Sequence, residues 1–171
     1  MTENMGLSYN GRKRGVGMVY LQQMSREMCH DFYRGFQNDP AVGHYYVFSY
    51  DPAWVDAYFH RNQTPDRLLF AIMLDGRIIG ECKLKDMDLE KHTCRMGIHL
   101  LNDSVKEKGY GTQAEQLVLR HAFENLNMET VFADAMLGNM RSRHVLEKVG
   151  FCETGQDDTF AYYRCDRENG T

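Results

Sequence analysis

The residues best suited to chemistry lie at 106–112, where Gly109 and Gly111 follow two lysines and precede an amphipathic run. Glycines leave backbone N–H groups accessible and permit positive φ. A helix N-terminus carries unpaired donors and about half a positive charge, and Lys106 and Lys108 add two mobile cations. The stretch therefore predicts a helix start that binds phosphate or pyrophosphate. The alternative is a glycine turn that caps a surface helix.

The same residues also fit the dinucleotide pattern G-x-G-x-x-[GA], over Gly109 to Ala114. That pattern requires the glycines to follow a buried strand directly. Here the preceding residues 102–108, "NDSVKEK", are too polar to end a buried parallel strand. Asp134 is only a loose match to the ribose-binding acid, and no Lys-Ser or Lys-Thr forms a Walker loop. Phosphate binding is therefore favoured over a nicotinamide-dependent oxidoreductase.

A second motif follows a predicted strand at 130–136, where residues 139–151 read "NMRSRHVLEKVGF". Together with residues 106–111, it resembles the GCN5-related N-acetyltransferase (GNAT) superfamily. The signature there is [QR]-x-x-G-x-[GA], then N-x-x-[AS] on a helix that ends in E-K-x-G-F. The serine and leucine before Glu-Lys-x-Gly-Phe resemble the RimJ/RimL-like branch, which acetylates the N-termini of ribosomal proteins. The "NDPAVGHYY" stretch at 38–46 also resembles that branch, and the resemblance spans residues 18–165.

The resemblance implies a GNAT fold, an α+β or mixed α/β fold. Its central twisted sheet is mixed and mostly antiparallel, with about seven strands and about four helices on both faces. It implies acetyl-CoA as cosubstrate, with no metal, in a gap between two central strands. Backbone groups near His99 to Leu101 meet the thioester, and the loop N–H groups hold the pyrophosphate. The cosubstrate-binding residues implied are Leu100, Leu101, Lys106, Lys108, Gly109, Tyr110, Gly111, Thr112, Asn139 and Ser142.

Two positions depart from the family pattern. Lys106 replaces the usual glutamine or arginine and keeps a cation there. Leu146 stands where many members carry a tyrosine that protonates the leaving thiolate. Ser142 or an ordered water is the replacement predicted for that role.

The implied reaction is direct attack of a neutral amine on the thioester. At neutral pH an α-amine is neutral far more often than a lysine-like amine, a difference of about 3 kcal/mol. The candidate bases are Glu81, then His99, then Asp86. Strand alternation places Glu81 and Lys83 on the face opposite Cys82. The alternatives are a solvated strand glutamate and a core histidine. Because no base stands out, an α-amine acceptor is favoured.

Aromatic residues cluster in the segments that build the acceptor side in this family. Their faces could hold a cationic amine, or Trp54 and Tyr58 could belong to the core stripe of a helix. The members are His44, Tyr45, Tyr46, Tyr50, Trp54 and Tyr58. The predicted acceptor is a protein N-terminus, and the alternative acceptors are a polyamine and an aminoglycoside. The alternative function is that of a non-catalytic acyl-CoA-binding module.

The elements that position these residues follow from periodicity and capping signals. We expect a disordered segment at 1–11 and one acetyltransferase domain over 12–171, with Asp75-Gly76 as a hairpin turn. Ser25 and Asp51-Pro52 start two helices, and Asn38 to Pro40 end the first. The predicted strands are 17–21, 68–74, 77–86, 93–101, 130–136, one from 150 and 160–165, and further helices begin at 109 and 139.

Composition limits the class further. The length of 171 residues indicates one domain. The net charge of −4 argues against a nucleic-acid partner. No run of 18 apolar residues indicates a membrane span, and no signal sequence is evident. We therefore expect a cytoplasmic protein that is a monomer or a homodimer, and the final strand, 160–165, could pair across such a dimer.

The cysteines are odd in number and lack C-x-x-C spacing, so neither a disulfide framework nor a zinc site is predicted. Each lies in a segment of apolar pattern, and we expect all to be reduced core thiols. They are Cys29, Cys82, Cys94, Cys152 and Cys165.

Overall fold

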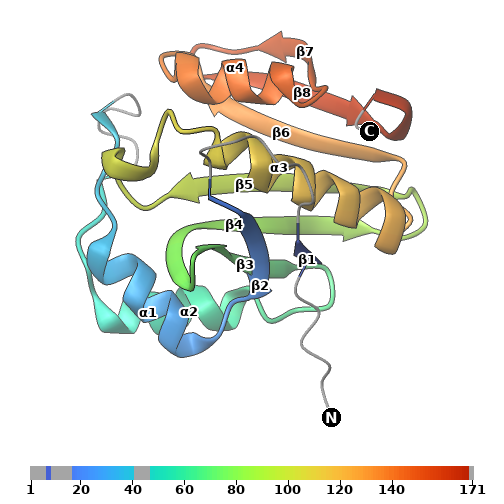
Figure 1. Cartoon of the computed structure of the whole chain (residues 1–171). Helices are drawn as coiled ribbons and strands as arrows, with labels where there is room; N and C mark the ends of the chain where they lie inside the picture. The colour runs from blue at the N-terminus through green and yellow to red at the C-terminus, as the bar shows by residue number, and fades with distance from the viewer. Residues whose placement is uncertain (1–6, 9–16, 41–46, 170–171) are drawn as a thin grey trace.

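The computed structural model describes residues 7–8, 17–40 and 47–169, and is built around one twisted sheet (Figure 1). Eight strands follow the order β1-β2-β3-β4-β5-β6-β8-β7. Neighbours are antiparallel except β5 and β6, which are parallel. The strands are β1 Leu7–Ser8, β2 Val19–Gln23, β3 Leu68–Leu74, β4 Arg77–Asp88, β5 Thr93–Leu100, β6 Thr130–Met136, β7 Cys152–Gln156 and β8 Phe160–Asp166. The predicted mixed, mostly antiparallel sheet is confirmed.

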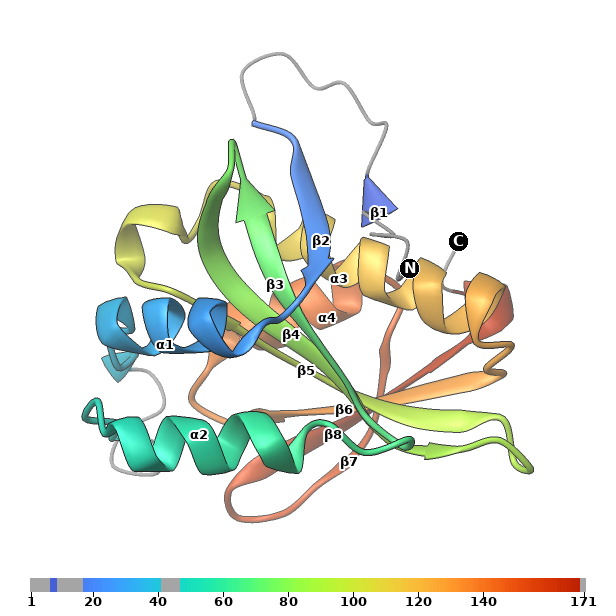
Figure 2. The ribbon, with the colours of Figure 1, turned by 90° about the horizontal axis from the view of Figure 1, so that it is seen from below.

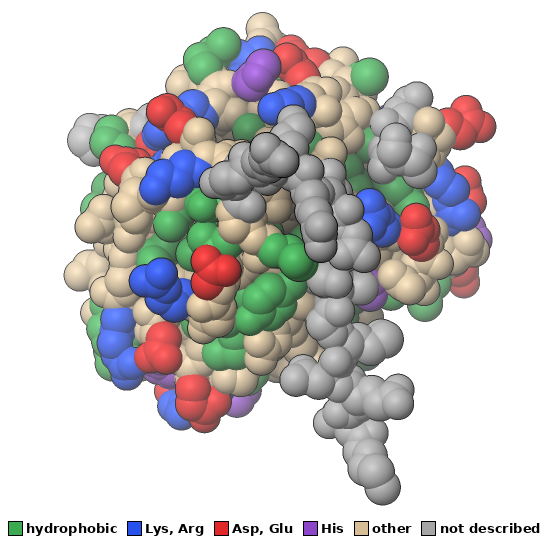
Figure 3. All heavy atoms as spheres, viewed as in Figure 1, with side chains coloured by type: hydrophobic (Ala, Val, Ile, Leu, Met, Phe, Trp, Pro, Cys, Tyr) green, Lys and Arg blue, Asp and Glu red, His purple; other side chains and the backbone are tan. Residues whose placement is uncertain are grey.

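Helices cover both faces of this sheet, as predicted, with α1 and α2 on one face and α3 and α4 on the other (Figure 2). A π-helical turn, His121–Asn125, continues α3. The α-helices are α1 Arg26–Gly35, α2 Pro52–Arg61, α3 Tyr110–Arg120 and α4 Met140–Lys148. On the face that carries α3 and α4, acidic and basic side chains are interspersed (Figure 3).

The central strand β3 shows why the sheet needs both layers. Leu69, Ala71 and Met73 pack in the core under α1 and α2. Phe70 and Ile72 pack in the core under α3 and α4. Because successive side chains point to opposite faces, a strand buried on both sides reads as a continuous apolar run.

The capping signals fix the helix starts. Ser25 caps α1 and Asp51 caps α2, each side chain accepting a hydrogen bond from a first-turn N–H, as predicted. The end of α1 was predicted at residues 38–40 but falls at Gly35, because Phe36 already has extended geometry with ψ 130°. The apolar stripe continues past the helix and does not mark its end.

Strands β5 and β6 separate early, and this separation positions the site. Their pairing runs only from Thr93 opposite Thr130 to Arg95 opposite Phe132. An ion pair of 2.8 Å joins Arg95 Nη1 to Asp134 Oδ1 just beyond the last pair. Past this point each strand keeps its antiparallel partner on its other side. The sheet is therefore open between β5 and β6.

The structure bears on the predictions made for the N-terminal segment and for the final strand. Residues 1–11 lie outside the described residues, apart from Leu7–Ser8, which pair with β2. The boundary of a single domain at residue 12 stays a prediction. The final strand β8 has β6 and β7 on its two sides, so its edges are occupied. The predicted pairing of this strand across a dimer is therefore wrong.

The cysteines are free, and four of the five are buried as predicted. Cys152 is exposed, so its predicted core position is wrong. It lies on β7 at the edge of the sheet, where every side chain is exposed.

Two features that would bear on function are absent from the described residues. No helix there is long and apolar enough to cross a membrane. No group of three or more His, Cys, Asp or Glu residues in that part of the chain could hold a metal ion.

Gly80 on β4 gives a first test of this packing. A Cβ there would lie 2.7 Å from the backbone oxygen of His99 and 2.9 Å from Ile72 Cδ1. We expect Gly80→Ala to destabilise the protein by about 1–3 kcal/mol, because such overpacking forces the sheet to shift. Urea unfolding followed by circular dichroism measures this. Gly155→Ala, with nothing within 4 Å of its Cβ, is the control, and equal midpoints for the two variants would contradict the packing.

Candidate active site

A cavity of about 710 Å³ lies where β5 and β6 separate. It has two parts, a loop half and an aromatic half. The loop half is lined by Lys106, Glu107, Gly109, Gly111, Thr112, Glu115, Asn139, Arg141 and Ser142. The aromatic half is lined by Tyr33, Phe36, Phe48, Trp54, Tyr58, Arg61, Lys83 and His99. The opening in the sheet thus joins the α3–α4 face to the α1–α2 face.

The start of α3 has the features that a phosphate requires. Gly109 is the N-cap with φ +80°, and no side chain caps the helix. The first-turn N–H groups are therefore left for a ligand or solvent. A Cβ on Gly111 would lie 3.7 Å from Leu100 Cδ1, so a larger residue would narrow the loop half. This arrangement fits the pyrophosphate of acetyl-CoA.

Cations gather at the mouth of the loop half. Lys106 Nζ lies 2.7 Å from Asp39 Oδ2 and 2.9 Å from Asp103 Oδ1. Arg141 lies 3.0 Å from the same Asp39 oxygen and 3.4 Å from Glu107. Asp39 thus holds both cations beside the α3 N-terminus. Lys106 is where the sequence predicted it, whereas Lys108 is exposed and does not line the cavity.

The second motif lies on the opposite wall. Asn139 caps α4 by accepting a hydrogen bond of 3.2 Å from the Ser142 backbone N–H. Both residues line the loop half. The side chain of Tyr110 packs against the core under α3, so a contact with the cosubstrate would come from its backbone N–H. The motif asparagine therefore has a structural task as well as a place in the cavity.

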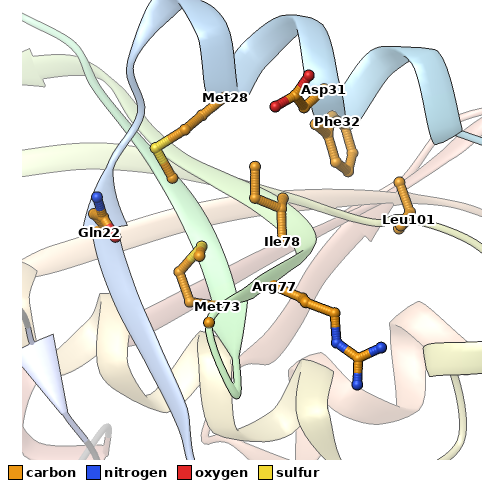
Figure 4. Close-up of a pocket in the computed structure, with 9 residues that line it drawn as sticks. Gln22, Met28, Asp31, Phe32, Met73, Arg77, Ile78 and Leu101 are labelled. Atoms are coloured by element: carbon orange, nitrogen blue, oxygen red, sulfur yellow. The ribbon is translucent and has the colours of Figure 1, made fainter.

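The backbone at the end of β5 is only partly available. The Leu101 N–H donates to Ile79 O at 2.8 Å, and Leu101 O accepts from the Gln37 N–H at 2.9 Å. Backbone groups alternate sides along a strand, so those of Leu100 and Ile98 face the opening. Leu101 also directs its side chain into a separate cavity of about 450 Å³ beneath α1 (Figure 4).

A buried carboxylate forms the floor of the aromatic half. Glu81 is 1% exposed, and its Oε1 accepts three hydrogen bonds. The donors are Tyr58 at 2.8 Å, Tyr33 at 3.0 Å and His99 Nδ1 at 3.1 Å. Lys83 Nζ donates to the Tyr58 hydroxyl at 3.3 Å. The solvated-strand interpretation of Glu81 is therefore wrong, and this residue is the centre of a polar cluster.

The charge state of this cluster follows from its contacts. Burial acts to raise the pKa of Glu81, but the hydrogen bond and charge of His99 and the charge of Lys83 outweigh it and lower that pKa. Glu81 is therefore an ionised acceptor at neutral pH. In neutral His99 the Nδ1–H must then be the donor, which leaves Nε2 able to accept a proton. The His99 side chain is 43% exposed and lines the cavity.

Aromatic rings build the rest of this half. Trp54 and Tyr58 stack, with centroids 5.2 Å apart and planes 9° from parallel. Phe48 packs against Trp54, and Tyr33 against both helix rings. The core interpretation of the helix stripe therefore holds for Tyr58, which is buried, whereas Trp54 is 40% exposed and its role in holding an amine stays a prediction.

Two other predicted residues, Tyr50 and Asp86, do not line the cavity. Tyr50 hydrogen-bonds His30 Nδ1 at 2.9 Å and does not line the cavity. The remaining aromatic residues predicted for the acceptor side, His44 to Tyr46, lie outside the described residues. Asp86 is exposed and lies 3.5 Å from Arg67, away from the cavity.

One residue of the site was missed. Glu115 is 2% exposed and lines the loop half, and its Oε2 has no hydrogen-bond partner. Burial raises the pKa of Glu115 to about 8. The signal in the sequence is an acidic residue inside the apolar run from Ala114 to Leu119, four positions after Gly111.

The fold and the geometry of the cavity fit an acyl-CoA-dependent transferase, and comparison with known proteins identifies the family. A family model described as "Acetyltransferase (GNAT) domain" matches residues 19–152. The chain belongs to this family and is an N-acetyltransferase. Members of the family use acetyl-CoA, and the resemblance inferred from the two motifs is confirmed.

Several relatives carry more specific names. The chain is 28% identical over 128 residues to "Putative ribosomal N-acetyltransferase YdaF" of Bacillus subtilis (strain 168), covering 70% of this chain and 69% of that protein. RimJ of Mycobacterium smegmatis, solved with CoA-disulfide, superposes with a TM-score of 0.72 at 20% identity, over 89% and 83% of the two chains. Spermidine N-acetyltransferase of Vibrio cholerae, solved with CoA and spermine, gives 0.76 at 13% identity, over 88% and 96%.

The loop can be tested with two matched glycines. Gly109 and Gly76 have φ +80° and +77°, and a Cβ added at either would meet no atom within 4 Å. Backbone strain from Gly109→Asp and Gly76→Asp should therefore be similar. We expect Gly109→Asp to weaken CoA binding at least tenfold, about 1.4 kcal/mol, because the carboxylate repels phosphate. Isothermal titration calorimetry measures this, and equal affinity for the two variants would remove the loop from the site.

Proposed function

We propose that this N-acetyltransferase acetylates the α-amine of a protein N-terminus, with acetyl-CoA as the acetyl donor. The observation that carries the proposed transfer is the Glu81–His99 pair, because it supplies a base at the wall of the aromatic half. The choice of an α-amine rests on the charges of that half. The cosubstrate is held in the loop half by the N–H groups after Gly109 and by the cations Lys106 and Arg141. The amine enters from the aromatic half and meets the thioester through the opening between β5 and β6.

His99 acts as the general base in this proposal. Its Nε2 accepts the amine proton while Nδ1–H remains bonded to Glu81, and the buried carboxylate stabilises the imidazolium that forms. Glu81 is a positioning residue, since it is 1% exposed and acts through His99. Tyr33 and Tyr58 fix the carboxylate oxygen that His99 meets.

The charges of the aromatic half favour an α-amine over a polyamine. Lys83 and Arg61 line it, whereas Glu81 on its floor is 1% exposed and already accepts three hydrogen bonds. Two like charges 4 Å apart near a protein surface repel by about 4 kcal/mol, so the additional ammonium groups of a polyamine meet an unfavourable field. An α-amine also requires about 3 kcal/mol less than a lysine-like amine to become neutral.

A second candidate acceptor is a small polyamine, favoured by the aromatic rings. Exposed aromatic faces bind cationic amines, and a spermidine N-acetyltransferase shares the fold. However, the Tyr58 ring already stacks on Trp54 and has Lys83 Nζ 5.3 Å and Arg61 Cζ 5.7 Å from its centroid. Its faces are therefore less available to a substrate cation, and the peptide acceptor is preferred.

The base can be tested with His99→Gln and Glu81→Gln. We expect both to lower kcat/KM by about 10²–10⁴-fold, because general-base catalysis contributes this much. The Kd for CoA should stay within threefold, since both side chains lie on the aromatic side of the opening. Steady-state kinetics and calorimetry measure these values. His60→Gln, at an exposed histidine of α2, is the control, and wild-type kinetics in His99→Gln would refute the base.

Acceptor preference is a separate test. We expect kcat/KM with N-terminal peptides to exceed that with spermidine or an aminoglycoside. Lys83→Glu should shift the peptide-to-spermidine ratio toward spermidine at least tenfold, by reversing one charge in the aromatic half. Lys85→Glu, two residues farther along β4, is the control. CoA release measures turnover, and tight CoA binding without turnover on any acceptor would indicate a binding module instead.

A further inference from the structure

We propose that Glu115 donates the proton that the departing thiolate of CoA takes up, which makes it a catalytic residue of the loop half. This inference rests on the proposed function, because it assigns the acid that complements the base His99. The geometry that points to it is a carboxyl that is 2% exposed, lines the cavity and leaves Oε2 without a hydrogen-bond partner.

Glu115 lies deeper in the cavity than the phosphate-binding loop. Gly111, Thr112 and Glu115 all line the loop half, and residues four apart lie one above the other on a helix. Glu115 is therefore one turn farther along α3 than Gly111. The loop with its cations forms the mouth, so the carboxyl faces the inner part of the loop half.

The strands beneath α3 show how far the Glu115 carboxyl lies from the mouth of the cavity. Burial raises the pKa of the Cys82 thiol most, and the carboxylates of Glu81 and, when ionised, Glu115 raise it further, which puts Glu115 near Cys82. Cys82 pairs with Ile98, whereas Gly111 lies over Leu100. Glu115 thus lies toward Ile98, only a few residues past Arg95, where β5 and β6 still pair. This is the closed end of the opening.

Acetyl-CoA has its phosphates and its thioester at opposite ends of one arm. With the phosphates at the α3 N-terminus, the arm extends inward, and the sulfur lies toward the closed end where Glu115 is. Among the described residues that line the loop half, Glu115 is the only buried carboxyl. Ser142, predicted for this role, belongs to the first turn of α4 beside Arg141, at the mouth.

The protonation state suits the task. Burial raises the pKa of Glu115 to about 8, so the carboxyl carries its proton at neutral pH. A free thiol has a pKa of about 8.5, which makes the transfer nearly thermoneutral, and a matched donor is the most effective acid.

The step balances with the residues already assigned. The amine nitrogen forms its bond to the acetyl carbon, and its proton goes to His99 Nε2. The carbon–sulfur bond breaks with its electron pair on sulfur, and the Glu115 O–H proton goes to that sulfur to give the CoA thiol. After release, His99 loses a proton to solvent and Glu115 regains one, so no further reactant is needed.

A purely structural role does not explain the residue. Glu115 lies on a helix face whose neighbours Ala114, Leu117 and Val118 are buried core residues. An unpartnered carboxyl there is destabilising relative to an apolar side chain of similar size. Its presence therefore has a stability cost that a proton donor would justify.

The test compares Glu115→Gln, Glu115→Met and the control Glu124→Gln, which removes an exposed charge just beyond α3. Under the proposal kcat falls at least 50-fold in both Glu115 variants, and the Kd for CoA by calorimetry stays within threefold. The loss of wild-type kcat above a pH of about 8 is absent from both variants. Glu124→Gln behaves as wild type.

A second readout does not depend on activity. A carboxyl whose pKa is raised on folding stabilises the protein at low pH and loses that contribution as pH rises from its unfolded value toward about 8. The Tm of Glu115→Gln minus the Tm of wild type should therefore increase between pH 5 and 8 and stay constant at higher pH. A constant Tm difference would contradict the buried acid.

The outcomes separate the proposals. Unchanged kcat in both Glu115 variants of an active enzyme overturns the proton-donor role alone, as does weaker CoA binding at unchanged kcat. A wild-type protein that acetylates none of the acceptors contradicts the proposed function as well.

Discussion

The early separation of β5 from β6 is the constraint on which the site depends. Parallel strands that pair normally leave no room between them, but here the pairing stops at Arg95 and Phe132. The ion pair between Arg95 and Asp134 ties the strands together just beyond the last backbone pair. Past that point the inward backbone groups of Ile98 and Leu100 face the opening. The cosubstrate and the acceptor can therefore approach one reacting centre from opposite faces of the sheet.

Two buried carboxyl groups on opposite faces of the sheet have pKa values shifted in opposite directions. Glu81 receives three donors on one oxygen and lies near Lys83, so its pKa is lowered despite burial. Glu115 receives no such donors, and burial raises its pKa to about 8. Environments that separate the pKa values of two titratable groups assign the base side and the acid side of a reaction. Here the sheet itself separates them.

Local signals in the sequence predicted most of the fold, because local chemistry determines those features. The turn at Asp75-Gly76, the caps at Ser25 and Asp51 and the glycine loop each follow from a few adjacent residues. The pairing of Glu81 with His99 depends on register between β4 and β5, so the sequence could nominate both residues but not their contact. The place of Glu115 in the cavity could not be predicted from the sequence, because a single acidic residue among apolar ones does not change the helical periodicity. The exposure of Cys152 depends on which strand lies at the edge of the sheet, a property of the whole topology.

The mouth and the floor of the site differ in how they are held. At the mouth, the positions of Lys106 and Arg141 depend on ion pairs with Asp39. A phosphate must compete with that carboxylate. The Arg141 side chain is 42% exposed, so its ion pair rearranges at little cost, whereas the side chains of Lys106 and Asp39 are only 12% and 18% exposed. On the floor, Glu81 is fixed by strand register and by hydroxyl groups from two helices. In the proposed function Arg141 is thus the adaptable group that meets the large cosubstrate, whereas the rigid floor meets the amine, where a small displacement changes the rate most.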